Sequence, residues 1–84
     1  MSYEILLTKK GNQDSKTYFV HGEHECDMCD FIKNHTNETN LIELTSDDIK
    51  AIKETAWYAN TNWDNPQLDD ELIEGTALKV LKHY

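Results

Sequence analysis

The sequence predicts a small α/β domain in which helices cover a mixed β-sheet. Two kinds of segment alternate along the 84 residues: short apolar runs rich in β-formers, and longer runs whose apolar residues recur at helical spacing. Strands interleaved with helices favour a layered α/β arrangement with at least one right-handed parallel crossover. Because a chain of this length has room for one core, we expect residues 1–84 to form a single domain.

The first two strands are predicted near the N-terminus. Residues 3–8 (YEILLT) and 17–21 (TYFVH) are apolar and rich in β-branched and aromatic side chains. Between them lies KKGNQDSK, whose Gly11, Asn12 and Asp14 are turn formers. The pattern indicates a β-hairpin or two neighbouring strands.

A short helix is predicted to begin at or just before Cys26. Gly22 ends the second strand, and after it the apolar spacing changes from two residues to that of a helix. The residues on the shared face are Met28, Phe31, Ile32 and His35. The parallel crossover should therefore run from the strand 17–21 through this helix to the next strand.

That next strand is predicted at residues 40–45 (NLIELT), followed by a second helix from about 47 to 59. Ser46 is a good N-cap, and two acidic residues after it favour the positive end of a helix. A core-facing stripe is formed by Ile49, Ile52, Ala56 and Ala59. The polar run NTNWDN and Pro66 end the helix in a turn or loop.

The last segment is predicted to hold a short strand at about 71–73 and a closing helix. Gly75 separates the two, and Thr76 can serve as the N-cap of the helix. Its inward side chains would be Ala77, Leu78 and Leu81. The predicted order is β, β, α, β, α, β, α.

Composition and charge narrow the classes of function. Sixteen acidic and eight basic side chains give a net charge of −8, which repels nucleic acid phosphates and argues against DNA or RNA binding. No segment approaches the roughly 20 apolar residues of a membrane span, and SYEILLTKK after Met1 does not resemble a secretory signal. We therefore expect a soluble, cytoplasmic monomer that does not bind membranes.

The chemically most informative feature is the pair Cys26 and Cys29 in HGEHECDMCDFIK, the only cysteines in the chain. Two residues between two thiols is the spacing of a redox dithiol or of half a metal site. A thiol at the start of a helix faces unpaired backbone N–H groups and the positive end of the helix dipole, and both favour the thiolate. We therefore expect Cys26 to be the exposed, attacking nucleophile, and Cys29, one turn into the helix and partly shielded, to resolve the mixed disulfide.

The charged side chains around the two cysteines have opposite effects on thiolate formation. Carboxylates at positions 23, 25, 27 and 30 disfavour a second anion. If protonated, His21 and His24 would offset part of this repulsion. We expect a less acidic thiol than in a strongly oxidising dithiol protein.

Three other interpretations of these residues stay open. A zinc site would use His21, His24, Cys26 and Cys29, although small zinc sites usually draw ligand pairs from two separated segments. His35 is excluded from it, since nine helical residues span about 13 Å. The pair could also be inert core residues. In a different class of function, the acidic runs SDD and DDELIE suit a small acidic binding protein or inhibitor that occupies a basic groove.

The motif CDMC at the start of a helix, with LIELT, SDDIKAIKETAWYA, NPQL, ELIEG and TALKVLKHY after it, resembles the glutaredoxins, particularly the phage-type and hydrogen-donor members. The resemblance covers about residues 17–84 and leaves the N-terminal strand and turn, residues 1–16, outside the match. It implies a thioredoxin-like three-layer sandwich, with a mixed sheet of about four strands and an extra N-terminal strand at the edge.

The same resemblance implies a function and further site residues. It implies a thiol-disulfide oxidoreductase that reduces protein disulfides or glutathione mixed disulfides, with a protein such as ribonucleotide reductase as recipient. No cofactor would be bound, and glutathione or a flavin reductase would supply electrons. Substrate would contact backbone at Asn65, Pro66, Gly75 and Thr76, with the proline held in the cis form as in the family.

Overall fold

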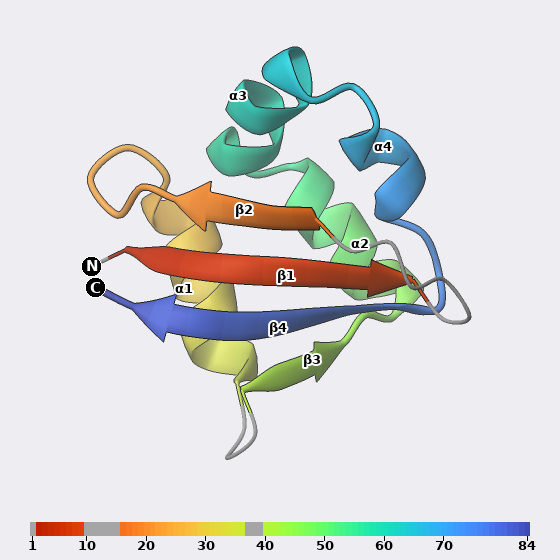
Figure 1. Ribbon diagram of the computed structural model, residues 1–84, viewed down its shortest axis with the longest axis horizontal. Helices are drawn as coiled ribbons and strands as arrows, with labels where there is room; N and C mark the ends of the chain where they lie inside the picture. Colours follow the sequence, from red (N-terminus) through yellow and green to blue (C-terminus); the bar gives the residue numbers. More distant parts are fainter. Residues whose placement is uncertain (1, 10–15, 37–39) are drawn as a thin grey trace.

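The structure is a computed structural model that describes residues 2–9, 16–36 and 40–84. The predicted turn at Gly11, Asn12 and Asp14 lies outside these ranges. Along the chain the described elements are β1 (Tyr3–Lys9), β2 (Lys16–Val20), α1 (Cys26–His35), β3 (Leu41–Glu43), α2 (Ser46–Lys53), α3 (Ala56–Asp64), α4 (Leu68–Glu71) and β4 (Thr76–His83) (Figure 1).

The four strands form one sheet in the order β2-β1-β4-β3, and every neighbouring pair is antiparallel. The predicted parallel crossover is therefore wrong, because β2 and β3, the strands on either side of α1, lie at opposite edges of the sheet. The N-terminal strand is also not an added edge strand. It pairs with β2 on one side and β4 on the other, at the centre of the sheet.

The C-terminal segment accounts for this change in topology. Thr76–His83 is a strand and not the predicted helix, because the buried residues Thr76, Leu78 and Val80 recur every second position. β4 pairs along the whole of β1, from Lys9 opposite Thr76 to Tyr3 opposite His83. It thus occupies the central place that a parallel strand would have needed.

The single helix predicted for residues 47–59 is two helices with a break at Glu54 and Thr55. The Thr55 hydroxyl donates to the Ile52 carbonyl oxygen at 2.6 Å and accepts from the Tyr58 N–H at 3.2 Å. One threonine side chain thus ends α2 and caps α3.

The start of α2 also differs by one residue from the prediction. Its N-cap is Thr45, which forms a reciprocal capping box with Asp48, whereas Ser46 is the first helical residue. The strand predicted near residues 71–73 is the end of the short helix α4 and the turn after it. Leu68 and Leu72 are buried there, and at i, i+4 spacing both fall on the inner face of a helix.

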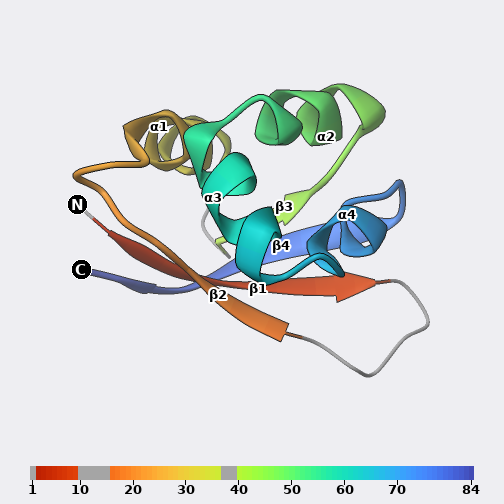
Figure 2. The ribbon, with the colours of Figure 1, turned by 90° about the horizontal axis from the view of Figure 1, so that it is seen from above.

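The helices cover one face of the sheet, as Figure 2 shows from above. This two-layer arrangement does not confirm the predicted thioredoxin-like three-layer sandwich; what the structure shows is a small α/β fold with a four-stranded antiparallel sheet. The core between the layers includes fully buried Ile5, Val20, Met28, Ile32, Ile52, Trp57 and Leu78. Among the described residues no helix combines the length and apolar character needed to cross a membrane.

Candidate functional site

The loop between β2 and α1 is fixed by hydrogen bonds among its own residues. The His21 carbonyl oxygen accepts from the N–H groups of His24 at 3.3 Å and Glu25 at 2.8 Å. In return, the Glu25 carboxylate accepts from the His21 N–H at 2.8 Å, and this side chain is only 4% exposed. The loop therefore holds the first residue of α1, Cys26, in a defined place after the end of β2.

The two cysteines differ in environment as the sequence predicted. Cys26 is the first residue of α1 and is exposed, whereas Cys29 is 4% exposed and lies in the core. Neither cysteine is in a disulfide. One thiol is thus accessible at a helix start while the other lies one turn behind it.

Burial also raises the pKa of the Cys29 thiol, and the nearby carboxylates of Glu25 and Asp30 raise it further. The pKa of Tyr3 on β1 is raised for similar reasons, first by burial and then by Cys29 and Asp30. Cys29 therefore stays protonated near neutral pH. Of the two thiols, only Cys26 is suited to a first attack on a disulfide in solution.

A second of the four predicted carboxylates, after Glu25, also has a structural role. Asp27 accepts hydrogen bonds from the N–H groups of Met28 and Ala56, each at 2.8 Å. Met28 lies in the first turn of α1 and Ala56 is the first residue of α3. The charge of Asp27 is therefore neutralised in part by two helix starts, which reduces its repulsion of a thiolate at the neighbouring Cys26.

The zinc interpretation finds no support in the geometry. In the part of the chain that the structure describes, no three side chains of His, Cys, Asp or Glu stand close enough together to hold a metal ion. The set His21, His24, Cys26 and Cys29 is therefore not assembled. The His21 ring instead packs edge-on against Phe19, with 4.6 Å between ring centroids.

Two of the predicted substrate-binding residues lie far from the dithiol. Thr76 pairs with Lys9 at one end of β1, while Val20, after which the dithiol loop begins, pairs with Tyr3 at the other end. Six residue steps along a strand span about 20 Å. Gly75 and Thr76 instead form the turn into β4: Gly75 has a φ of 92°, and the buried Thr76 hydroxyl donates to the Glu71 carbonyl oxygen at 2.6 Å.

The other two predicted residues follow α3. The peptide bonds of the described residues are all trans, so Pro66 lacks the cis form that the resemblance implies. Asn65 ends α3, and its side-chain oxygen accepts from the Lys16 ammonium group at 2.6 Å. Asn65 also lines a groove of about 320 Å³ that reaches Glu25, the residue before Cys26.

This groove contains residues that the sequence did not single out. Its walls are the strand β2, through Thr17 and Phe19, and the helix α3, through Asn60, Thr61 and Asp64. The alternation in KTYFV could have signalled it, because Tyr18 and Val20 are buried while Thr17 and Phe19 are exposed. The groove thus lies between the edge of β2 and polar residues of α3, and it reaches the residue before Cys26.

Comparison of the chain with protein families, curated proteins and solved structures found no match. A function must therefore be inferred from the geometry of the dithiol and its surroundings.

Proposed function

We propose that the protein is a thiol-disulfide oxidoreductase that acts through Cys26 and Cys29. The observation that supports this function most directly is the contrast between the two thiols. Cys26 is exposed at the first residue of α1, and Cys29 is buried one turn later. An accessible thiol at a helix start with a second thiol beside it is the arrangement that attack followed by resolution requires.

The thiol-disulfide exchange proceeds in two steps. The Cys26 thiolate attacks one sulfur of a substrate disulfide, and the other substrate sulfur leaves as a thiolate that takes up a proton. Cys29 then loses its proton and displaces the substrate from Cys26, which leaves a Cys26–Cys29 disulfide and a fully reduced substrate. Two electrons pass from protein to substrate, and a low-molecular-weight thiol such as glutathione, or a flavin reductase, returns them.

The difference in burial between the two thiols supports this order of roles. Because the pKa of Cys29 is raised by burial, this thiol does not compete for the substrate at neutral pH. After Cys26 has formed a mixed disulfide, Cys29 is the nearest nucleophile along the helix. We propose that the substrate is a disulfide-containing protein such as ribonucleotide reductase, and that the protein acts as a cytoplasmic monomer. Both proposals come from the resemblance to glutaredoxins and not from the antiparallel sheet.

Single cysteine variants test the proposal. We expect Cys29→Ala to accumulate a mixed disulfide with glutathione at Cys26, and Cys26→Ser to form none. Alanine is chosen for position 29 because Cys29 is only 4% exposed and a buried hydroxyl costs more than a buried methyl group. Mass spectrometry after incubation with oxidised glutathione measures both results. The proposal fails if Cys29→Ala traps no adduct or if Cys26→Ser still reduces disulfides.

A second candidate, an acidic binding protein, is favoured by the distribution of charge. Residues 46–74, which include α2, α3 and α4, carry eight carboxylates and two lysines, whereas the strands carry four lysines and two glutamates. The acidic excess thus lies mainly on the helical layer, where it could meet a basic groove. Such binding would not need the cysteines, so the double variant Cys26→Ser, Cys29→Ala would keep it.

A further inference from the structure

The outer side of β2 is an edge of the sheet, where no further described strand pairs. In the antiparallel pairing with β1, alternate residues of β2 turn their peptide groups away from the ladder. The Phe19 carbonyl oxygen identifies which ones, since it accepts from the Trp57 indole N–H at 3.2 Å and so faces outward. Thr17, two residues earlier, therefore also presents its N–H and C=O outward, and these groups make no hydrogen bond to any described residue.

Beyond this edge lies α3. Figure 1 shows the helix past the outer side of β2, and the groove of about 320 Å³ separates the two. The groove extends from Asn65 at one end to Glu25 at the other, so its long direction follows β2 toward Cys26. A chain segment added to β2 could therefore reach Glu25, the residue that precedes Cys26 in the chain.

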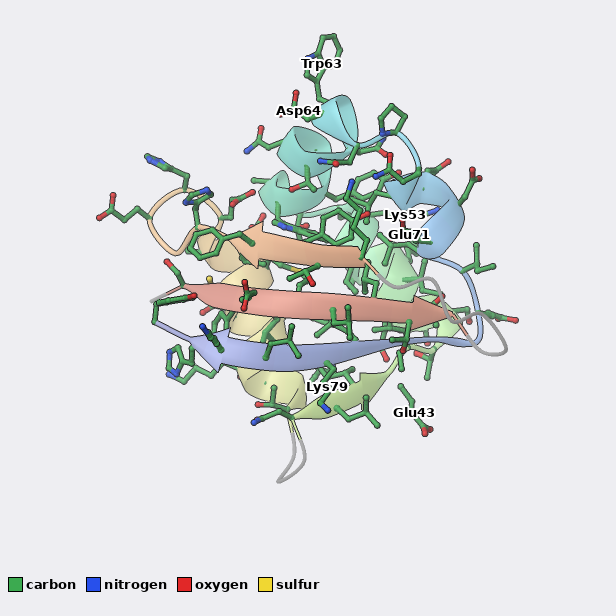
Figure 3. All side chains as sticks on the ribbon, in the orientation of Figure 1. Glu43, Lys53, Trp63, Asp64, Glu71 and Lys79 are labelled. Atoms are coloured by element: carbon green, nitrogen blue, oxygen red, sulfur yellow. The ribbon has the colours of Figure 1, made fainter. Side chains whose placement is uncertain are left out.

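The charges of the groove indicate which side chain such a segment carries. Its cation Lys16 is already engaged, because the ammonium group donates to the Asn65 side chain at 2.6 Å and lies 5.5 Å from the centre of the Tyr18 ring. The Asp64 carboxylate, by contrast, has no hydrogen-bond or ion-pair partner among the described residues. Figure 3 shows Asp64 at the end of α3, beside the Trp63 side chain, which is 86% exposed.

We propose that the groove between β2 and α3 binds an extended segment of a protein substrate as an additional strand beside β2, with a lysine or arginine directed at Asp64 and the substrate disulfide at Cys26. Main-chain hydrogen bonds to the N–H and C=O of Thr17 and to the N–H of Phe19 supply affinity, and the position of the basic side chain supplies specificity. The inference rests on the proposed function and adds to it the class of substrate, a disulfide in or beside an extended basic segment.

The experiment compares two peptides as glutathione mixed disulfides. One alternates valine and threonine, with a central lysine and a terminal cysteine; the other has proline in place of two threonines and cannot join a sheet. With the Cys29→Ala protein, we expect the strand-forming peptide to react at least about tenfold faster, a factor that corresponds to about 1.4 kcal/mol. Equal rates for the two peptides would overturn the inference.

A pair of proline variants locates the effect. Thr17→Pro removes an outward N–H without removing a hydrogen bond to β1, whereas Glu43→Pro makes the same change on β3, the opposite edge of the sheet. We expect Thr17→Pro to abolish the preference for the strand-forming peptide, while Glu43→Pro keeps the preference and the rate with oxidised glutathione. Equal effects of the two variants would contradict a site at β2.

Two further measurements separate this inference from the proposed function. Asp64→Lys should lower the rate with the lysine peptide about two- to fivefold, as expected for an exposed ion pair, and Asp70→Lys on α4 should not. An S-methylated form of the peptide cannot exchange, yet it should shift the amide NMR signals of Thr17 and Phe19. If the peptide shifts these signals while Cys26 reacts with no disulfide, the proposed function fails and the groove remains a peptide-binding site. If the peptide shifts neither signal, the groove does not bind an extended segment and the inference is wrong.

Discussion

The carboxylate of Asp27 accepts a hydrogen bond from the backbone N–H of Ala56 at 2.8 Å, and so joins the start of the dithiol helix to the start of α3. Its other oxygen accepts from the Met28 N–H at the same distance. One side chain between the two cysteines therefore serves two helix N-termini. These two hydrogen bonds give the acidic residue beside Cys26 a structural role.

Replacement of this carboxylate should destabilise the fold. Asp27→Ala leaves the N–H groups of Met28 and Ala56 without their acceptor, and loss of a helix-capping side chain typically costs about 0.5–2 kcal/mol. Urea unfolding measures the change. Asp30→Ala is the matched control, since Asp30 is exposed on the same helix and makes no hydrogen bond to a described residue; equal losses for the two variants would contradict the role of Asp27.

The two thiols should react with an alkylating reagent at very different rates. We expect iodoacetamide near pH 7 to modify Cys26 in the folded protein and to leave Cys29 unmodified until the chain is unfolded, because Cys29 is buried and burial raises its pKa. Peptide mapping by mass spectrometry identifies the modified residue. Equal labelling of both cysteines in the folded state would show that Cys29 is not shielded.

A hydrogen-bonded group between α3 and α4 should make stability depend on pH. Tyr58 donates to the Asp69 carboxylate at 2.6 Å, and Lys53 lies 3.1 Å from the same oxygen. The hydrogen bond to Asp69, with burial, raises the pKa of Tyr58 to about 12, and the hydrogen bonds from Tyr58 and Lys53 lower the pKa of Asp69. The folded state thus favours the protonated tyrosine and the ionised aspartate.

The sign of each effect follows from linkage. The contribution of Asp69 is present above the ordinary carboxyl pKa of about 3.9 and is lost as the pH falls through its lowered value; that of Tyr58 is present below about pH 10 and is lost as the pH rises toward 12. We therefore expect the stability difference between the wild type and Tyr58→Phe to be constant between about pH 5 and 9 and to shrink outside it. A difference that does not change at either end would contradict the assignment.

The two tryptophans should differ in both fluorescence and energetic importance. Trp57 is fully buried and donates to the Phe19 carbonyl oxygen, whereas Trp63 is 86% exposed. Trp57→Phe should cost about 1–3 kcal/mol, because it leaves that carbonyl oxygen without its partner, and Trp63→Phe should change stability by less than about 0.5 kcal/mol. The Trp63→Phe protein should emit at shorter wavelength than the Trp57→Phe protein; the reverse order would contradict the burial of Trp57.

Local patterns predicted the N-terminal half of the fold well. The hairpin strands, the start of α1 at Cys26 and the strand around Ile42 follow from apolar periodicity, because each segment has one clear period. The contrast between exposed Cys26 and buried Cys29 followed from the same helix register. These features depend on residues close together in the sequence.

The C-terminal half depends on pairing between distant residues. In TALKVLKH the apolar positions fit both a helix and a strand, and the choice is made by β1, which offers an open edge along its whole length. In the sequence, Thr55 looks like an ordinary helical residue. The structure shows that its side chain ends α2 and caps α3. Once β4 is a strand, β2 and β3 are at opposite edges and the parallel crossover is lost.

Only part of the candidate site could be predicted, because the rest of it also depends on contacts between residues that are distant in the sequence. The dithiol is a local feature, whereas the placement of Asn65, Gly75 and Thr76 was taken from a resemblance and depends on topology. Asn65 lies on the groove that leads to Glu25, and Thr76 lies at the far end of the sheet. No local pattern indicated that α3 would face the edge of β2.

The most direct test of the central claim is a redox titration of the wild-type protein in mixtures of reduced and oxidised glutathione, read by intact mass after acid quenching. We expect a reversible transition to a species that has lost two hydrogens, with the Cys26–Cys29 disulfide found by peptide mapping. If Cys26 instead accumulates a stable glutathione adduct while Cys29 remains a free thiol at every ratio, the pair does not work as a dithiol and the proposed function is wrong.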